Sequence, residues 1–345
     1  MISSLQSWRF LFALMIFLHH SAGFKVGGSC GVAFFMMLSG FVMAIGYGEK
    51  CVQTSFNYMN FMKKRLIRLY PLHLLCLLLF FVIQLLASNK IEWLALMPNF
   101  LLIQSWFPNS FYYFSGNAVS WCLADMIFFY VCFPFLIKGY SRCNKKVLGF
   151  VLFTLFTFYF GIVYVIPNEK AHAFLYIFPL FRLLDFIIGI LIYYLYTFLV
   201  EGKIDEKLQS FSYVRKTLIE CIPIILLLLF MFAFPLIPLK IYCASYYWIP
   251  MGFVILIFAL FNKNGGGISR LLSNGKLIIL SDISFSFYML HWLVIMCCNK
   301  AFRILNIDML WELRLCLELL ISLIASFYIY YYEKRCTSYL KSKFL

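Results

Sequence analysis

Apolar stretches of about 17 to 25 residues recur along the whole chain and are separated by short polar connections. A helix of that length crosses the hydrocarbon core of a bilayer, which is about 30 Å thick. Irregular backbone facing lipid would leave its polar groups unpaired, so helices are the expected form. A transmembrane barrel would instead show alternating strands of about 10 residues, and the run from Cys221 to Phe234 does not alternate. The sequence therefore predicts an all-α, polytopic transmembrane helix bundle.

The composition excludes an ordinary water-soluble fold. Of the 345 residues, 64% are apolar and only 12% are charged, against about 25% charged in a typical soluble domain. We expect about ten spans, near residues 8–24, 30–48, 66–87, 118–137, 147–166, 174–199, 218–238, 241–261, 277–298 and 309–332.

The polar connections are short. The longest, near residues 88–117 and 200–217, are too small to fold alone, so residues 1–345 are expected to form one membrane domain without an appended soluble domain. The segment from Ile91 to Trp106 is apolar but contains Pro98 and Asn99. We interpret it as a re-entrant or interfacial piece on the outer side, with a true span as the alternative.

The net charge of +15 is read here as a topology signal. With the N-terminus inside, 21 of the 29 basic residues fall on the cytoplasmic side, which predicts an even number of spans and two cytoplasmic termini. Contacts with lipid head groups are expected there, and nucleic acid is not. The basic residues assigned to that side are Arg9, Lys50, Lys63, Lys64, Arg65, Arg68, Lys138, Arg142, Lys145, Lys146, Lys203, Lys207, Arg215, Lys216, Lys263, Arg270, Lys276, Lys334, Arg335, Lys341 and Lys343.

Ionisable residues inside membrane segments are the functional candidates, because such groups are costly unless they are paired or face a cavity. Arg9 and His20 are eleven positions apart, so eleven steps of about 100° return to nearly the same helix face about 16 Å further along. A neutral imidazole near pH 7 can accept a hydroxyl proton, which makes His20 a candidate general base. The alternative is that His19 and His20 are ordinary interfacial residues.

Two arginines open the third expected span. Arg65 and Arg68 are three residues apart and share a helix face. Paired guanidiniums suit polyphosphate, because each planar fork binds phosphate oxygens bidentately. The alternative is the ordinary excess of basic residues at a cytoplasmic helix end.

Other candidates carry weaker signals. Asp125 is placed to orient a histidine or to serve as a helix-start charge. Arg182 and Asp185, spaced i,i+3, are most simply a structural ion pair. His291 and His73 are candidates either for chemistry or for buried packing. Twelve cysteines and five histidines show no zinc-type spacing, so no metal site is expected.

Six motifs in chain order resemble the membrane-bound acyltransferase-3 family, whose bacterial members O-acylate O-antigen, capsule and other surface glycans. The resemblance covers residues 9 to about 292. The matching residues are Arg9 and His20; Phe34, Phe35, Ser39, Gly40 and Phe41; Arg65, Arg68 and Pro71; Trp121, Leu123, Phe129, Tyr130 and Pro134; Phe181, Arg182, Asp185, Phe186 and Gly189; and Ser284, Tyr288, His291 and Trp292.

The resemblance implies a transfer reaction and assigns roles to residues. His20 would be the catalytic base, and Arg9, Arg65 and Arg68 would bind the phosphates of a cytoplasmic acyl-coenzyme A, most simply acetyl-coenzyme A. The acceptor would be a hydroxyl of a surface polysaccharide or its lipid-linked precursor, at the bacterial inner membrane. Supporting or substrate-binding roles would fall to Ser39, Trp121, Asp125, Tyr288 and His291.

The chain departs from the family pattern at one carboxylate. The family has a glutamate five residues after the tryptophan, where this chain has Met126, and Asp125 sits one residue earlier and about 100° around the helix.

Two other functional classes stay open from the residues alone. One is a membrane-bound O-acyltransferase of another kind, in which His291 or His73 would be essential. The other is a glycan flippase, polymerase or transporter that binds lipid-linked sugars without acyl transfer.

Overall fold

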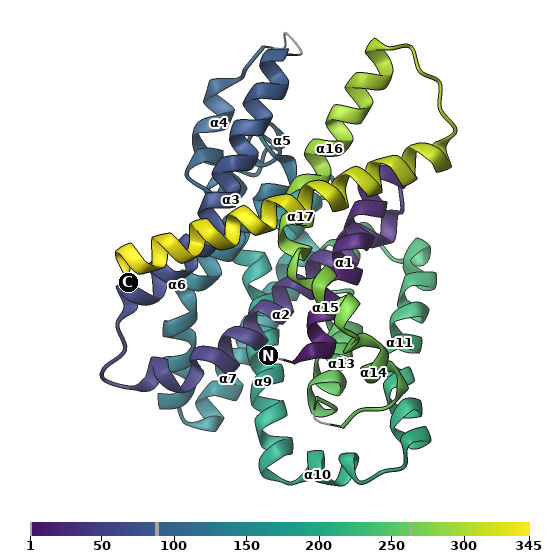
Figure 1. Cartoon of the computed structure of the whole chain (residues 1–345). Helices are drawn as coiled ribbons and strands as arrows, with labels where there is room; N and C mark the ends of the chain where they lie inside the picture. The colour runs from purple at the N-terminus through teal and green to yellow at the C-terminus, as the bar shows by residue number, and fades with distance from the viewer. Residues whose placement is uncertain (1, 87–89, 263) are drawn as a thin grey trace.

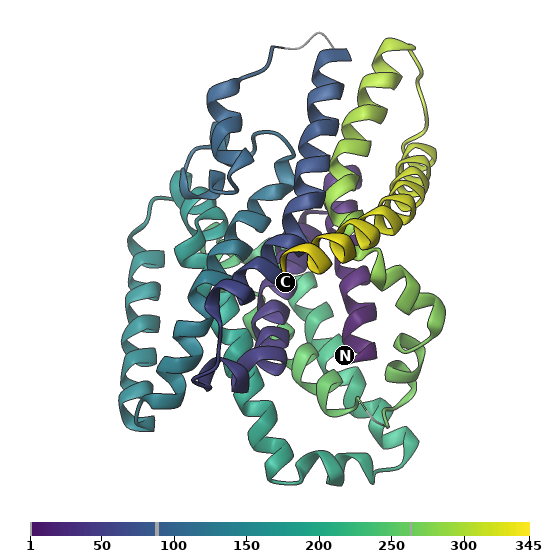
Figure 2. The same ribbon diagram turned by 60° about the vertical axis from the view of Figure 1, so that its left-hand side comes forward.

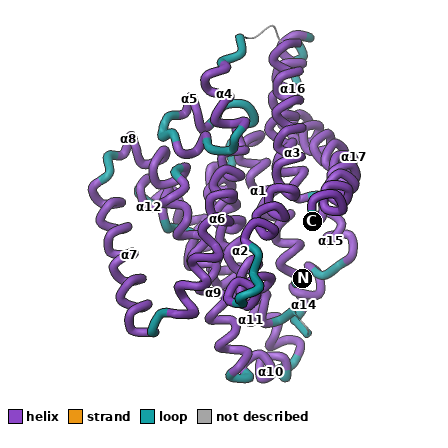
Figure 3. Tube along the Cα trace, turned by 90° about the vertical axis from the view of Figure 1, so that its left-hand side faces the viewer, coloured by secondary structure: helices purple, strands orange, loops and turns teal. Residues whose placement is uncertain are grey.

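The computed structural model describes residues 2–86, 90–262 and 264–345, and the regular elements in these residues are all helical (Figures 1 and 3). This confirms the predicted all-α class. The long helices are α1 Ser3–Ala22, α2 Lys25–Val52, α3 Tyr58–Leu86, α6 Trp121–Arg142, α7 Lys145–Val165, α9 Pro179–Glu201, α11 Tyr213–Ala233, α13 Trp248–Leu260, α16 Ser284–Ile304 and α17 Trp311–Phe344. The short ones are α4 Trp93–Phe100, η1 Gln104–Trp106, α5 Ser110–Tyr113, η2 Ala118–Ser120, α8 Asn168–Ala171, η3 His172–Ile177, α10 Ile204–Gln209, η4 Phe234–Leu236, α12 Leu239–Ala244, α14 Gly267–Leu272 and α15 Gly275–Asp282.

Nine helical segments in the described residues are long and apolar enough to cross a membrane. They correspond to nine of the ten expected spans. The tenth, α1, is long enough but less apolar, because Arg9, two histidines and several serines interrupt it. It is nevertheless packed inside the bundle against α2, α15 and α16.

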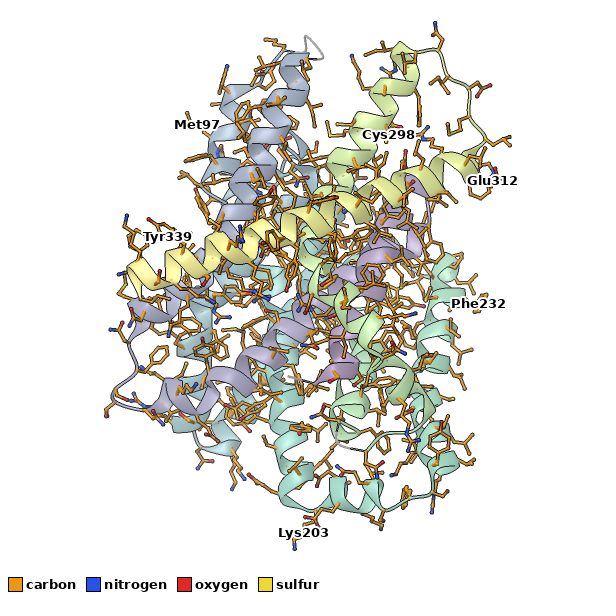
Figure 4. The ribbon with its side chains drawn as sticks, viewed as in Figure 1. Met97, Lys203, Phe232, Cys298, Glu312 and Tyr339 are labelled. Atoms are coloured by element: carbon orange, nitrogen blue, oxygen red, sulfur yellow. The ribbon has the colours of Figure 1, made fainter. Side chains whose placement is uncertain are left out.

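Large apolar side chains cover the outside of the bundle, as expected for a surface that faces lipid. Figure 4 shows Met97 and Phe232 pointing away from the helices, and their exposed fractions are 64% and 80%. Helices α7, α11 and α17, which carry many of the exposed apolar residues, are also the least buried spans.

The boundaries of three expected spans were partly wrong. The expected span 277–298 is broken at Ile283, where α15 ends and α16 begins. The expected span 241–261 consists of α12 and α13, which meet around Ser245. The last helix extends twelve residues beyond the expected residue 332 and runs diagonally across the bundle (Figures 1 and 2). Apolar composition alone does not predict where a helix is interrupted or how far it extends beyond its apolar stretch.

The segment from Ile91 to Trp106 forms short helices instead of a span. Helix α4 has only eight residues, or about 12 Å of helix, and contains Pro98. Asn99 is fully buried and its side-chain amide donates to the Ser120 hydroxyl at 3.1 Å. The segment packs beside the upper part of α3 (Figure 1), where it contributes to a cavity described below.

Two glycines let α2 and α9 approach each other closely. A Cβ atom on Gly40 would lie 2.1 Å from the Phe186 carbonyl oxygen, and one on Gly189 would lie 1.9 Å from the Met37 carbonyl oxygen. Small residues at a crossing point allow backbone contact between membrane helices. The crossing fixes α2, which contains Ser39, against α9.

We expect Gly189→Ala to destabilise the protein, because the added methyl group can be accommodated only if α2 and α9 separate. Overpacking of this kind typically costs about 1 to 3 kcal/mol. Gly161→Ala in α7 is the matched control, since a Cβ there would meet nothing within 4 Å. Thermal unfolding of the detergent-purified variants should show a lower midpoint for Gly189→Ala only. Equal midpoints would contradict the close crossing.

Candidate functional site

Helices α1 and α16 bring two histidines into direct contact. His20 Nδ1 lies 2.8 Å from His291 Nε2, and the two rings are nearly parallel with centroids 5.1 Å apart. The indole of Trp292 packs edge-on against His20 with centroids 5.2 Å apart. His291 is fully buried, whereas His20 is only partly buried.

The hydrogen bonds of this pair define which nitrogen of each neutral ring carries the proton. His291 Nδ1 lies 2.7 Å from the backbone carbonyl oxygen of Tyr288, so this nitrogen must donate. Nε2 of His291 is then an acceptor, and His20 Nδ1 must donate to it. Nε2 of His20 keeps its lone pair. The pair therefore presents the unprotonated nitrogen that a general base requires.

His20 lines a cavity of about 580 Å³, which we call the histidine cavity. Its wall combines aromatic rings with polar side chains. It is bounded by the end of α3, α4, the segment around α5, the start of α6 and α16. Its aromatic lining residues are Phe80, Phe111, Phe114, Trp121 and Trp292, and its polar ones include His19, Gln84, Lys90, Glu92 and Ser115.

His19 also lines this cavity, but its ring forms a hydrogen bond within the turn between α1 and α2. Its Nδ1 lies 3.2 Å from the carbonyl oxygen of Phe24. A Cβ on Gly28 would come within 2.8 Å of the His19 ring, so the ring packs directly on the α2 backbone. His19 therefore supports the turn that follows α1.

A second cavity, of about 720 Å³, contains all three predicted arginines, and we call it the arginine cavity. Arg9 from α1 and Arg65 and Arg68 from α3 line it together with Ser39 from α2. None of the described residues that line it is acidic. Three cations without a lining carboxylate make this cavity suited to a polyanion.

Arg65 is held in place by aromatic residues. Its Nη2 donates to the Tyr47 hydroxyl at 2.8 Å, and its guanidinium carbon lies 4.8 Å from the Tyr47 ring centroid and 5.9 Å from that of Tyr130. Arg68 is exposed. Sequence reasoning found the arginines but not their aromatic partners, because nothing in the local pattern links Tyr47 to a helix that follows it.

Two carboxylates lie close enough to the arginines to act on them electrostatically. Arg9 is repelled by Arg68 and attracted by Asp282 and Glu333. The Glu333 carboxylate also accepts a hydrogen bond from Ser286 at 2.9 Å. The sequence interpretation missed Glu333, since it lies in the extension of α17 beyond the expected span.

The two cavities lie on opposite sides of a thin wall. Val119 and Trp121 line the histidine cavity, whereas Cys122 and Tyr288 line the arginine cavity. The Tyr288 hydroxyl donates to the Val119 carbonyl oxygen at 2.8 Å and so closes the wall. Tyr288 therefore takes part in both sites: it lines the arginine cavity, and its backbone carbonyl oxygen accepts the hydrogen bond that orients His291.

The structure does not bring Asp125 to the histidine pair. Asp125 is fully buried and lines neither cavity, and the Ser105 hydroxyl is the hydrogen-bonding group beside its carboxylate. Its electrostatic neighbours include Arg182 and Asp185. The predicted histidine-orienting role of Asp125 is therefore replaced by His291 and the Tyr288 carbonyl, which is a tertiary contact between α1 and α16.

Arg182 and Asp185 form the predicted ion pair. Nε of Arg182 lies 3.3 Å from Asp185 Oδ2, and both side chains are buried. The Trp248 indole donates to Asp185 Oδ1 at 2.6 Å. The pair and Trp248 link α9 to α13.

The two remaining histidines line neither cavity. His73 Nε2 lies 3.0 Å from the backbone carbonyl oxygen of Asn99, and the ring is fully buried. His172, the first residue of η3, packs among Tyr113, Phe114 and Tyr176, and burial lowers its pKa. Of the five histidines, His20 alone is partly exposed in a cavity and hydrogen-bonded to a second imidazole.

Comparison with known proteins decides the family. The acyltransferase domain family, acyltransferase-3, matches residues 2–331. The chain belongs to this family. The match extends over all the helices that form the two cavities, so the acyltransferase domain includes both of them.

One curated relative of this acyltransferase is Acyltransferase MdmB of Streptomyces mycarofaciens, which is 26% identical over 288 residues. The alignment covers 78% of this chain and 68% of the relative. No solved structure gives a significant match. Family and relative agree on acyl transfer, which argues against the flippase, polymerase or transporter alternative.

Proposed function

We propose that this acyltransferase moves an acyl group, most simply acetyl, from a cytoplasmic acyl-coenzyme A to a hydroxyl of a bacterial surface polysaccharide or its lipid-linked precursor. The observation that carries the proposal is the arrangement of the site. A polarised histidine pair lies on one side of a thin wall, and a cavity with three arginines lies on the other.

The arginine cavity has the chemistry that a coenzyme A donor requires. Its phosphates would meet Arg9, Arg65 and Arg68, of which Arg65 is oriented by Tyr47. The apolar remainder of the cavity, including Phe35 and Leu123, suits the pantetheine arm. An arm directed toward Tyr288 would bring the thioester to the wall next to the histidine pair, and the Tyr288–Val119 contact would have to open for the acceptor hydroxyl to reach it.

The histidine cavity has the chemistry that a sugar acceptor requires. Flat aromatic faces such as Trp121 and Trp292 can stack on the apolar face of a sugar ring, while a few polar groups fix its orientation. A hydroxyl next to His20 Nε2 would lose its proton to that nitrogen as its oxygen attacks the thioester carbonyl. The new C–O bond forms, the C–S bond breaks, and the thiolate leaves with the proton returned by His20.

The orientation of the chain in the bacterial inner membrane is part of the proposal. We expect both termini in the cytoplasm, since 21 of 29 basic residues fall on that side in the assigned topology. Reporter fusions at residue 345 should behave as cytoplasmic. A clearly extracytoplasmic fusion would place the arginine cavity on the wrong side for a cytoplasmic donor.

The function is tested directly with purified protein in nanodiscs. Incubation with radiolabelled acetyl-coenzyme A should release free coenzyme A, and addition of the glycan fraction from the host membrane should move the label into glycan. A protein that binds lipid-linked sugars without acyl transfer would do neither. Mass analysis of surface glycan from a deletion strain then identifies the acyl group and the acceptor.

A further inference from the structure

Helix α17 contains a carboxylate that is fully buried yet fully bonded. The side chain of Glu318 has no exposed surface. Its Oε1 accepts a hydrogen bond from Arg314 Nε at 2.9 Å, and its Oε2 accepts one from the Ser21 hydroxyl. A buried charge in a membrane helix is costly unless it is paired, and such residues mark functional sites by default.

The bonds of Glu318 and Arg314 connect three helices. Ser21 lies on α1, directly after His20. The Arg314 guanidinium also donates through Nη2 to the Asn299 side chain on α16, and it lies 5.8 Å from the Phe302 ring centroid. The network Ser21–Glu318–Arg314–Asn299 therefore joins the two helices that contain the histidine pair.

The network is placed to fix the position of His20 relative to His291. Ser21 and His20 are about 100° apart on α1, so one residue faces α17 while the other faces α16. Asn299 is eight residues after His291, about 12 Å further along α16. The helix α1 ends directly after Ser21 and Ala22, at Gly23 with φ +70°. The network adds polar contacts with α17 to those that the last turn of α1 makes with His291, Trp292 and α2.

We propose that Ser21, Glu318, Arg314 and Asn299 are positioning residues for the histidine pair. They fix the end of α1 relative to α16, so that His20 Nδ1 stays on His291 and Nε2 faces the acceptor. The proposal rests on the proposed function of His20 as general base. It goes beyond it by assigning four residues that line neither cavity and belong to none of the sequence motifs.

The sharpest test uses two substitutions of equal shape, Ser21→Thr and Ser21→Val, in the full-length protein in nanodiscs. Threonine keeps the hydroxyl that Glu318 accepts, and valine does not. A displacement of about 1 Å at a reacting group can cost about 100-fold in rate. We expect kcat to fall about 10- to 100-fold for Ser21→Val, to stay near the wild-type value for Ser21→Thr, and the donor KM to change little in either.

Glu318→Gln should also lower kcat about 10- to 100-fold. The double variant Ser21→Val with Glu318→Gln should have the same kcat as Glu318→Gln alone, because both substitutions break the same Ser21–Glu318 contact. Ser326→Ala is the matched control on α17: its buried hydroxyl bonds only within its own helix, and kcat should be unchanged. If Glu318→Gln fails to fold, the comparison of Ser21→Thr with Ser21→Val still tests the positioning role.

Two outcomes separate failure of this inference from failure of the proposed function. Equal kcat for Ser21→Val and Ser21→Thr, with His20→Ala inactive in the same assay, would overturn the positioning role and leave the function intact. An active His20→Ala would overturn the base assignment, and with it the pair that the network is proposed to position.

Discussion

Replacing His20 with alanine should abolish detectable glycan acylation in cells while leaving membrane insertion intact. The substitution removes the imidazole whose Nε2 lone pair is fixed by the hydrogen bond from its Nδ1 to His291. General-base catalysis typically contributes about 10² to 10⁴ in rate. Acyl content of the glycan and the amount of protein in the membrane should be measured together, so that loss of activity is not confused with loss of protein.

His19→Ala is the matched control in the adjacent position. Its ring supports the α1–α2 turn through Phe24 and packs on Gly28, so its loss should lower stability modestly and rate only slightly. The two histidines differ by about 100° around α1, and only His20 contacts His291. Full acylation activity in His20→Ala, or an equal loss of activity in both variants, would contradict the role of His20 as general base.

The structure explains why part of the site was predictable from the sequence. Arg9 and His20 belong to one helix, so their eleven-residue spacing predicts a shared direction. The sequence predicts that both residues face one cavity, whereas the structure places Arg9 in the arginine cavity and His20, together with His19, in the histidine cavity. Arg65 and Arg68 are likewise predictable as neighbours from their i,i+3 spacing. Local periodicity determines such relations before any tertiary contact is known.

The contacts that complete the site arise between helices far apart in the chain, and periodicity does not encode them. His291 orients His20 across 271 positions, and Glu318 meets Ser21 across 297. Asp125 illustrates the opposite error. A carboxylate in this stretch of sequence suggested an orienting role, but in the structure Asp125 lies beside Ser105 and Arg182 and lines neither cavity.

The donor site gives the second large prediction. Arg65→Ala and Arg68→Ala should each weaken binding of acyl-coenzyme A about ten- to a hundredfold, because a charge-assisted contact to phosphate is typically worth about 1.5 to 3 kcal/mol. Arg68 is exposed and its loss should leave the fold unchanged. Arg65 packs among Tyr47, Phe61 and Tyr130, so Arg65→Ala should also lower the unfolding temperature slightly.

Lysine should restore donor binding only in part at either position, since a point charge cannot reproduce the planar fork. At position 65 the shortfall should be larger, because the guanidinium also donates to the Tyr47 hydroxyl and stacks on its ring. Lys63→Ala is the matched control: it removes an exposed cation from the same helix, but one that does not line the arginine cavity. Calorimetric titration with coenzyme A measures all five variants. Normal affinity in both arginine-to-alanine variants would move the donor site away from this cavity, whereas equal weakening in Lys63→Ala would mean that the donor responds to general surface charge instead of a defined pair of guanidiniums.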